Sequence, residues 1–193
     1  TIFDRSLYGN NGTIYGASWV MQGGLWVLSF DGTDDYVERT ATPITDYPCT
    51  LVAWVNSTAS AIQKALGLYA SAADNLLSIG LHSNGQARWD AFNGATQTAG
   101  AFGPDCRNAY HLIGCVFVSA TERIPYVDGI AYEISVANVP FPAVNTISVG
   151  RKASLTKEKY LTGQAGVELI TNTILSAGWH QNFYAQTRHL FGV

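Results

Sequence analysis

Short runs of branched and aromatic residues recur along almost the whole chain, and turn residues bound each run. Within these runs apolar and polar positions tend to alternate with a period of two, which is typical of strands whose alternate side chains face a core. The pattern predicts strands at residues 26–30, 36–39, 50–56, 65–69, 76–81, 86–92, 111–118, 124–127, 131–136, 146–149 and 163–171. The chain is therefore predicted to be built mainly from β-strands.

Four dipeptides between these runs tolerate the positive φ that a tight hairpin turn requires. They are Asp31-Gly32, Asn84-Gly85, Asn93-Gly94 and Asp128-Gly129, and they predict an antiparallel meander. A single open sheet of about eleven strands would leave its apolar face in water. The prediction is therefore an all-β fold in which two antiparallel sheets pack as a β-sandwich.

The end of the chain carries a helical pattern. Ser176 can cap a short helix whose apolar side chains include Trp179, Phe183 and Leu190, and we expect less than about a tenth of the residues to be helical. Composition does not shift along the chain, so residues 1–193 are expected to form a single domain. Residues 51–55 are apolar on both faces, which predicts that Trp54 is buried inside the sandwich.

The charge balance argues against a nucleic-acid partner. Only 13% of the residues are charged, and 11 Lys and Arg against 14 Asp and Glu leave a net charge of −3. Phosphate backbones are bound by basic stripes. The one basic cluster consists of Arg151, Lys152, Lys157 and Lys159. Glu158 lies inside it, and we expect a solvated loop there.

Membrane insertion is not expected either, because no apolar run approaches the length of a membrane span.

The three cysteines, Cys49, Cys106 and Cys115, are odd in number and lack the C-x-x-C spacing of a zinc ribbon. Cys49 and Cys115 lie in apolar runs, where a free thiol behaves as a small hydrophobic side chain. Reactive thiols need a cationic and partly exposed setting. The sequence therefore predicts unreactive core cysteines and excludes a disulfide framework.

The usual catalytic motifs are absent from the sequence. A polysaccharide hydrolase needs two carboxylates across a cleft, and one strand can supply both at alternate positions. No two of the 14 acidic residues lie two positions apart, and only Glu133 and Glu168 fall well inside predicted strands. His111 is expected to be a hydrogen-bonded structural residue. We predict that the protein is not an enzyme, and a hydrolase built from acids of different strands remains the alternative.

Asp31, Asp34 and Asp35 cluster in one turn. Oxygen-rich turns suit Ca²⁺, which takes about six to eight oxygen ligands, so these acids are candidate calcium ligands. The alternative is an ordinary turn in which the Asp31 carboxylate accepts backbone N–H groups. No motif requires a cofactor.

Trp89 is the best candidate for a sugar-binding ring. Sugars stack on flat rings beside hydrogen-bonding groups, and Arg88 and Asp90 flank Trp89. We therefore predict a ligand-binding loop edge and neighbouring strand that carry Asp34, Asp35, Arg88, Trp89 and Asn93. Weaker aromatic candidates are Trp19 and Tyr69. Most of the 5 Trp, 10 Tyr and 8 Phe must lie in the core, so a core position for Trp89 is the alternative.

A series of short segments occurs in a recognisable order and spacing. Residues 28–37 read LSFDGTDDYV, and the other segments are residues 3–13, 50–55, 110–112, 126–129, 147–151, Gly163 and residues 172–176. From Phe3 to Ser176 these segments resemble the laminin G-like, concanavalin A-like lectin and glucanase jelly-roll family. Tyr110-His111 stands where the family usually has Trp-His. The resemblance implies a jelly-roll sandwich and is much less specific for function.

Two departures from the family pattern matter. The family normally has one more strand before the segment at residues 3–13. We therefore expect a domain that lacks its first strand or is an excerpt of a longer chain, with preceding sequence or another chain covering the open edge. The closing strand of the family usually carries Ile-Asp-Glu-Val, whereas Ala165, Gly166, Val167 and Glu168 stand here. In related domains an acid there helps to hold calcium, so the resemblance alone does not imply a calcium site.

Together these features predict a non-catalytic, lectin-like adhesion or display module of a larger extracellular or virion assembly, such as a phage fibre, tail or capsid surface. Low charge and abundant Gly, Ala, Thr and Asn favour such a component. The expected partners are a cell-surface glycan or neighbouring subunits, with oligomers formed through the assembly. The alternative is a purely structural virion or surface protein without a sugar ligand, and a glycan hydrolase ranks third.

Overall fold

The structure is a computed structural model that describes residues 1–6, 8–40, 44–94, 96–133 and 135–193. Its strands are β1 (Thr13–Tyr15), β2 (Ser18–Gln22), β3 (Leu25–Asp31), β4 (Tyr36–Thr40), β5 (Cys49–Ser57), β6 (Gln63–Tyr69), β7 (Leu76–Leu81), β8 (Gln86–Asn93), β9 (Thr96–Asp105), β10 (His111–Phe117), β11 (Arg123–Val127), β12 (Ile130–Ala131), β13 (Thr146–Val149), β14 (Lys152–Ala153), β15 (Lys157–Glu158) and β16 (Thr162–Thr171). The helix α1 (Ala177–Thr187) and the 3-10 helix η1 (Arg188–Leu190) follow the last strand.

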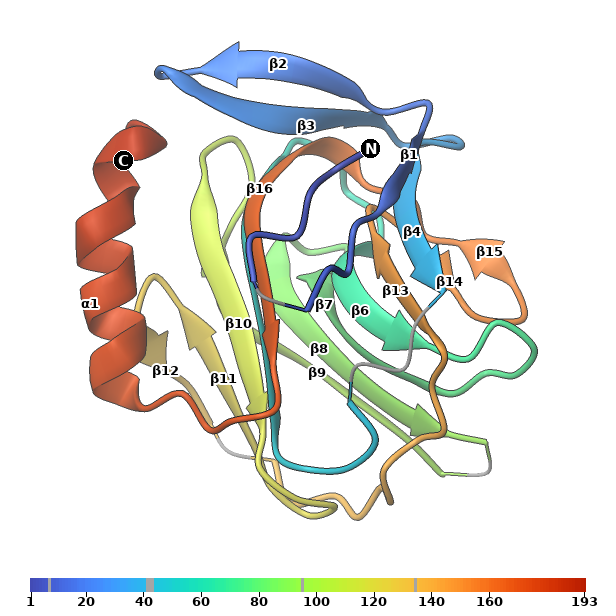
Figure 1. Ribbon diagram of the computed structural model, residues 1–193. Helices are drawn as coiled ribbons and strands as arrows, with labels where there is room; N and C mark the ends of the chain where they lie inside the picture. Colours follow the sequence, from blue (N-terminus) through green and yellow to red (C-terminus); the bar gives the residue numbers. More distant parts are fainter. Residues whose placement is uncertain (7, 41–43, 95, 134) are drawn as a thin grey trace.

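Two seven-stranded antiparallel sheets form a sandwich, as predicted (Figure 1). Sheet I has the strand order β1-β4-β13-β6-β7-β8-β9, and sheet II has the order β12-β11-β10-β5-β16-β3-β2. Strands β14 and β15 pair separately with each other. The Asn84-Gly85 and Asn93-Gly94 turns join neighbouring strands of sheet I, and both glycines have the positive φ that the sequence predicts.

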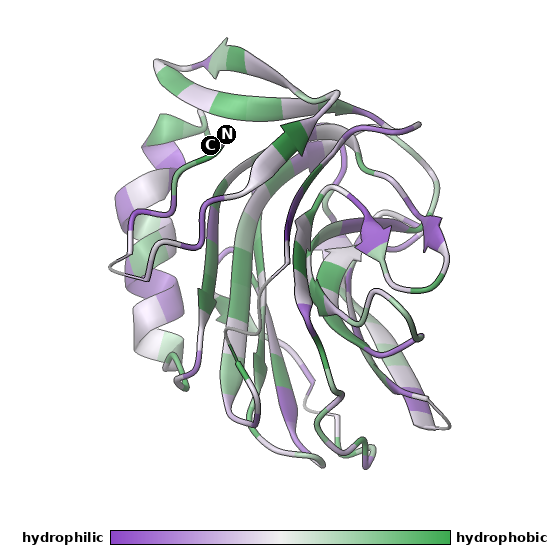
Figure 2. Ribbon diagram, turned by 45° about the vertical axis from the view of Figure 1, so that its right-hand side comes forward, coloured by the Kyte–Doolittle hydropathy of each residue, from purple (hydrophilic) through white to green (hydrophobic). Residues whose placement is uncertain are grey.

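Alternate residues of the strands fill one core between the two sheets. In β5, Leu51, Ala53 and Val55 are buried there, and Leu66 and Leu68 of β6 belong to the same core. The alternation is visible along the strands in Figure 2 as changes between green and paler or purple segments. This period of two is the signal from which the strands were predicted.

All three cysteines are free and buried, as predicted. Burial raises the pKa of the Cys49 and Cys106 thiols to about 12 and that of Cys115 well above its usual value. The thiols are therefore neutral at physiological pH and pack as small hydrophobic side chains.

The C-terminal helix covers the outer face of sheet II (Figure 1). Ser176 caps it as predicted, because its Oγ accepts a hydrogen bond from Trp179 N at 3.2 Å. Trp54 is fully buried beneath the helix and stacks on Phe191 with ring centroids 4.5 Å apart. The burial of Trp54 is confirmed, but its side chain packs on the outer face of sheet II and not between the sheets.

Several local predictions are wrong. Asp31-Gly32 is not a hairpin turn, because β3 belongs to sheet II and β4 to sheet I, so this turn carries the chain from one sheet to the other. Of the described residues of the predicted strand 131–136, only Ala131 lies in a strand, β12, and Glu133 lies outside the strands, while residue 134 is outside the described residues. Strands β1, β2, β9, β14 and β15 were not predicted. In the described residues no helix is long and apolar enough to cross a membrane.

Candidate functional site

Trp89 lies in the core and not on the surface. It is 4% exposed and shares the inner face of β8 with Ala87 and Ala91, both fully buried. The neighbouring strand approaches its ring closely, since a Cβ atom on Gly100 would lie 2.7 Å from Trp89 Nε1. The prediction of an exposed stacking ring is wrong because the alternation of β8 turns position 89 inward. Tyr69 is likewise fully buried.

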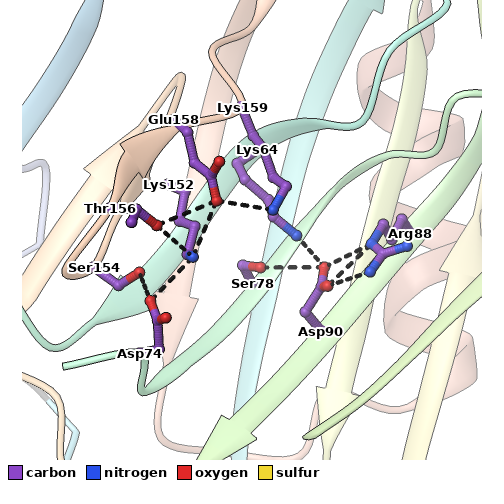
Figure 3. A network of polar contacts seen from close by, with 10 residues as sticks. All are labelled: Lys64, Asp74, Ser78, Arg88, Asp90, Lys152, Ser154, Thr156, Glu158 and Lys159. Atoms are coloured by element: carbon purple, nitrogen blue, oxygen red, sulfur yellow. Dashed lines mark hydrogen bonds and ion pairs between the residues drawn. The ribbon is translucent and has the colours of Figure 1, made fainter.

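Arg88 and Asp90, on either side of Trp89, lie on the outer face of sheet I (Figure 3). Asp90 is buried and forms ion pairs with Lys64 of β6 and with Arg88, whose Nη2 donates to Asp90 Oδ1 at 2.7 Å. Burial lowers the pKa of Lys64 to about 8, although Asp90 opposes the shift. Burial also disfavours ionised Asp90, but Lys64 and Arg88 outweigh it and keep the pKa of Asp90 below its usual value. The three groups are therefore charged at neutral pH and satisfy one another.

An ion pair between Lys152 and Asp74 ties the β14–β15 hairpin to the loop that joins β6 and β7, and further ion pairs lie within the hairpin segment (Figure 3). Lys152 Nζ lies 3.0 Å from Asp74 Oδ1 and 3.2 Å from Glu158 Oε1. Lys159 Nζ lies 3.0 Å from the same Glu158 oxygen. Lys152 is only 5% exposed. The solvated loop predicted for this basic cluster is confirmed for the exposed Lys157 but not for Arg151 and Lys152. These two are buried and pair with Glu38 and Asp74, which lie far away in the sequence, so the local sequence does not reveal the pairings.

The outer face of sheet I is polar along its central row. Because register partners in neighbouring strands share a face, the pairings Thr13–Glu38, Glu38–Ser148, Ser148–Gly67, Gly67–Ser78 and Ser78–Asp90 trace a row across six strands. The β14–β15 hairpin covers the middle of this face. The β1–β4 end carries an open pocket.

This pocket, called here the tyrosine pocket, has a volume of about 230 Å³. It is lined by Asn11, Thr13, Tyr15, Glu38, Arg39 and Thr40. Tyr15 is 45% exposed and stacks on Tyr36 of the next strand, with ring centroids 4.5 Å apart. The tyrosine pocket is thus lined mainly by hydroxyl, amide, guanidinium and carboxylate groups, with the partly exposed Tyr15 side chain at its side.

A buried charge supports the tyrosine pocket. The Arg151 guanidinium lies 3.4 Å from the centroid of the Tyr36 ring, and Arg151 Nη2 donates to Glu38 Oε2 at 2.6 Å. Arg151 is 2% exposed. Arg151 therefore fixes Tyr36 and Glu38, and the position of the Tyr15 ring follows from its stacking on Tyr36.

The acidic turn borders the same end of sheet I. Asp31 Oδ1 accepts hydrogen bonds from Thr33 N at 2.8 Å and from Asp34 N at 3.3 Å, and Asp35 Oδ2 accepts one from Asp31 N at 2.9 Å. The predicted turn, in which Asp31 accepts backbone N–H groups, is therefore confirmed. Gly16 lies against the side chain of Asp35: a Cβ atom there would be 1.9 Å from Asp35 Oδ1.

The acidic turn supplies only some of the ligands that a calcium ion needs. One oxygen from each of Asp31, Asp34 and Asp35 lies within 4.8 Å of the others. Backbone hydrogen bonds, that of Thr33 above all, lower the pKa of Asp31, whereas burial and the neighbouring acids raise that of Asp35. Three carboxylates supply only part of the about six to eight oxygens that Ca²⁺ takes. Calcium binding at this turn stays a prediction.

The structure does not bring the predicted ligand-binding residues together. Asp34 and Asp35 precede β4, whereas Arg88 and Asn93 belong to β8, and three strands of sheet I separate the two. Asn93 Nδ2 donates to the backbone oxygen of Pro140 at 3.1 Å, which anchors a loop.

The sequence reading missed the tyrosine pocket because β1 is only three residues long. Its Thr-Ile-Tyr alternation was the available signal. His111 is structural as predicted, with Nδ1 at 2.7 Å from Asp128 Oδ2.

Comparisons with known proteins identify the fold only. No protein-family model and no curated protein matches the chain. Among solved structures, the binding domain of botulinum neurotoxin serotype G is similar with a TM-score of 0.74 and 12% identity. The binding domain of botulinum neurotoxin DC in complex with SialylT has a TM-score of 0.70 and 13% identity. The binding domain of Paraclostridial Mosquitocidal Protein 1 has a TM-score of 0.71 and 9% identity.

These similarities cover 96% of this chain and 48% to 49% of the neighbours. The chain thus spans about half the length of the solved domains that it resembles. At such low identity the likeness establishes a shared β-sandwich and assigns no ligand.

Proposed function

We propose that the chain is a non-catalytic, lectin-like module of the laminin G-like, concanavalin A-like jelly-roll family and that it binds a glycan in the tyrosine pocket. The observation that carries this proposal is the half-exposed Tyr15 ring beside Thr13, Thr40 and Glu38. The apolar C–H face of a sugar stacks on such a ring, while its hydroxyls pair with the polar groups around it.

Two further points support a binding role. One ion pair and one cation–π contact of Arg151 fix Glu38 and Tyr36, so these side chains are ordered before a ligand arrives, which lowers the entropic cost of binding. The similar solved structures are binding domains, and one is a complex with SialylT.

The setting of the module is part of the same proposal. Low charge and abundant small and polar residues fit an adhesion or display component of an extracellular or virion assembly. A glycan on a cell surface is then the partner that the tyrosine pocket contacts.

A glycan array with purified protein tests the proposal. We expect a bound glycan whose affinity falls about tenfold to a hundredfold in Tyr15→Ala, since loss of a stacked ring removes a hot-spot contact. Thr13→Val, which removes one hydroxyl, should weaken binding less. Tyr8→Ala is the matched control, because Tyr8 is 86% exposed and does not line the pocket.

Folding of each variant is checked by thermal melting. Absence of any bound glycan on the array, or unchanged affinity in a folded Tyr15→Ala variant, would overturn the proposed site. Release of reducing sugar from β-glucans would overturn the non-catalytic assignment.

A further inference from the structure

Strand β2 is an exposed sheet edge without the usual protection. It is the last strand of sheet II and pairs only with β3 among the described residues. In Figure 1 it lies at the top of the molecule with no element beyond it. A strand in this position presents unpaired backbone N–H and C=O groups, and proteins usually protect such edges with charge, proline, a bulge or a very short strand.

Two of the other three edges of the large sheets are protected by being very short, and the third is protected at one end. β12 is two residues long and β1 is three. β9 is longer, but it contains Pro104 and Asp105 and its register with β8 shifts near that end. β2 has five residues, Ser18–Gln22, paired with β3 without a register shift. No Asp, Glu, Lys, Arg or His lies anywhere between Arg5 and Asp31.

Large apolar side chains are exposed on one face of this edge. Trp19 is 44% exposed, Met21 54% and Trp26 58%. Met21 and Trp26 are register partners, and Trp19 lies two positions from Met21, so all three share a face. The opposite face is occupied, because Val20 and Leu25 pack toward Leu190 and Phe191 at the end of the chain. Green and white dominate this hairpin in Figure 2.

We propose that β2 pairs with β2 of a second copy of this chain across a two-fold axis, which joins the two copies of sheet II into one continuous sheet. Antiparallel strands are related by such an axis, and a two-fold interface must be complementary to itself. A segment without charge meets this condition, because no like charges are brought together.

The register that uses all five residues of β2 is centred on Val20. It places Trp19 opposite Met21 of the partner subunit, and Met21 opposite Trp19 of the partner subunit. Each exposed apolar side chain then has an apolar neighbour across the new strand pair. The pairing gives hydrogen-bond partners to the unpaired backbone N–H and C=O groups of β2. It also covers the exposed apolar side chains of this edge.

Sedimentation velocity over a wide range of protein concentration tests the proposal. We expect a monomer–dimer equilibrium in the unaltered protein. Met21→Lys should raise the dissociation constant at least about tenfold, because it places a charge at the centre of the paired edge. The matched control is Ile130→Lys, at the opposite edge of the same sheet, where Ile130 is 59% exposed. This control should leave the equilibrium unchanged.

Amide hydrogen exchange gives a second readout. The amides of residues 18–22 should become protected as the concentration rises through the dimer range. A monomer at every concentration would overturn the proposal, whatever else the face binds. The proposal would also be wrong if the dimer persisted in a folded Met21→Lys variant or if Ile130→Lys disrupted the dimer equally. It would likewise be wrong if the dimer formed without added protection of the β2 amides.

Discussion

The outer faces of the two sheets are covered in opposite ways. Over sheet II the cover is α1, and the contacts are aromatic and apolar: Trp54 stacks on Tyr184 and Phe191, and Trp54 Nε1 donates to Thr187 Oγ1 at 3.0 Å. Over sheet I the cover is the β14–β15 hairpin, which the Lys152–Asp74 ion pair ties to the loop before β7, and Lys64 and Asp90 form a buried ion pair on the same sheet face. Aromatic and apolar contacts therefore dominate on the outer face of sheet II, whereas buried charges are paired on the outer face of sheet I.

The difference teaches how each cover responds to perturbation. Apolar burial under α1 needs no particular charge state, so it should resist salt and fail mainly when volume is lost. A buried ion pair gains little net stability over an apolar pair, yet leaving one partner alone is costly. The charged outer face of sheet I should therefore be sensitive to the removal of single charges and tolerant of their joint replacement by apolar side chains.

The largest effect is expected from the helix-covered face. Trp54→Ala should lower the free energy of unfolding by about 3 to 5 kcal/mol, because it removes a fully buried ring and leaves a cavity beneath α1. Urea denaturation monitored by circular dichroism measures this. Trp26→Ala is the control, since Trp26 is exposed and should change stability far less. A Trp54→Ala variant about as stable as the unaltered protein would show that the helix is not an integral cover.

The charged face should show the next largest effect. Asp90→Ala leaves Lys64 buried without its acid, and we expect a loss of about 3 kcal/mol in urea denaturation. The triple replacement Lys64→Met, Arg88→Leu and Asp90→Leu should recover most of that loss, because Arg88 also pairs with Asp90 and three apolar side chains need no desolvation of charge. Asp105→Ala removes an exposed ion pair and should have little effect. Equal losses in the single and triple variants would contradict this view of the charged face of sheet I.

The same contrast explains how far the sequence could be interpreted. Local alternation predicts β7 and β13 with the bounds that the structure shows, and residues 51–55, apolar on both faces, indicate that β5 is buried on both sides. The helix α1 was predicted from Ser176, but nothing in the local sequence says that it covers the outer face of sheet II. β9 escapes prediction because its Ala and Gly residues carry little strand signal.

The functional surface could be predicted less well than the fold. A period of two assigns residues to two faces without saying which face is the interior, and Trp89 was placed on the wrong one. The ion pairs of Lys152 join Asp74 to the segment around Glu158, far along the chain, so composition suggested a solvated cluster. The tyrosine pocket depends on β1 meeting β4, a pairing across sequence that no dipeptide marks.

The smallest effect concerns the pH response of the helix-covered face. His180 on α1 is buried, stacks on Tyr126 with centroids 3.8 Å apart, and its Nε2 has no partner among the described residues. Burial lowers the pKa of His180 to about 4 in the folded protein, against an ordinary value near 6.5. The folded state thus favours the neutral ring, so this stability is present above about pH 6.5 and is lost as the pH falls toward 4.

Between pH 7 and pH 4.5, protonation of His180 in the unfolded chain should lower the free energy of unfolding by about 2 kcal/mol. Other groups titrate in the same range, and Glu168, whose pKa burial raises to about 7, acts in the opposite direction. The informative quantity is therefore the difference between the unaltered protein and His180→Leu in urea denaturation at the two pH values. His180→Leu lacks the titrating ring, so it should lose about 2 kcal/mol less than the unaltered protein on acidification. Parallel losses in the two proteins would mean that His180 can be protonated without disturbing α1, and the contrast between an apolar and a charged cover would then not extend to pH.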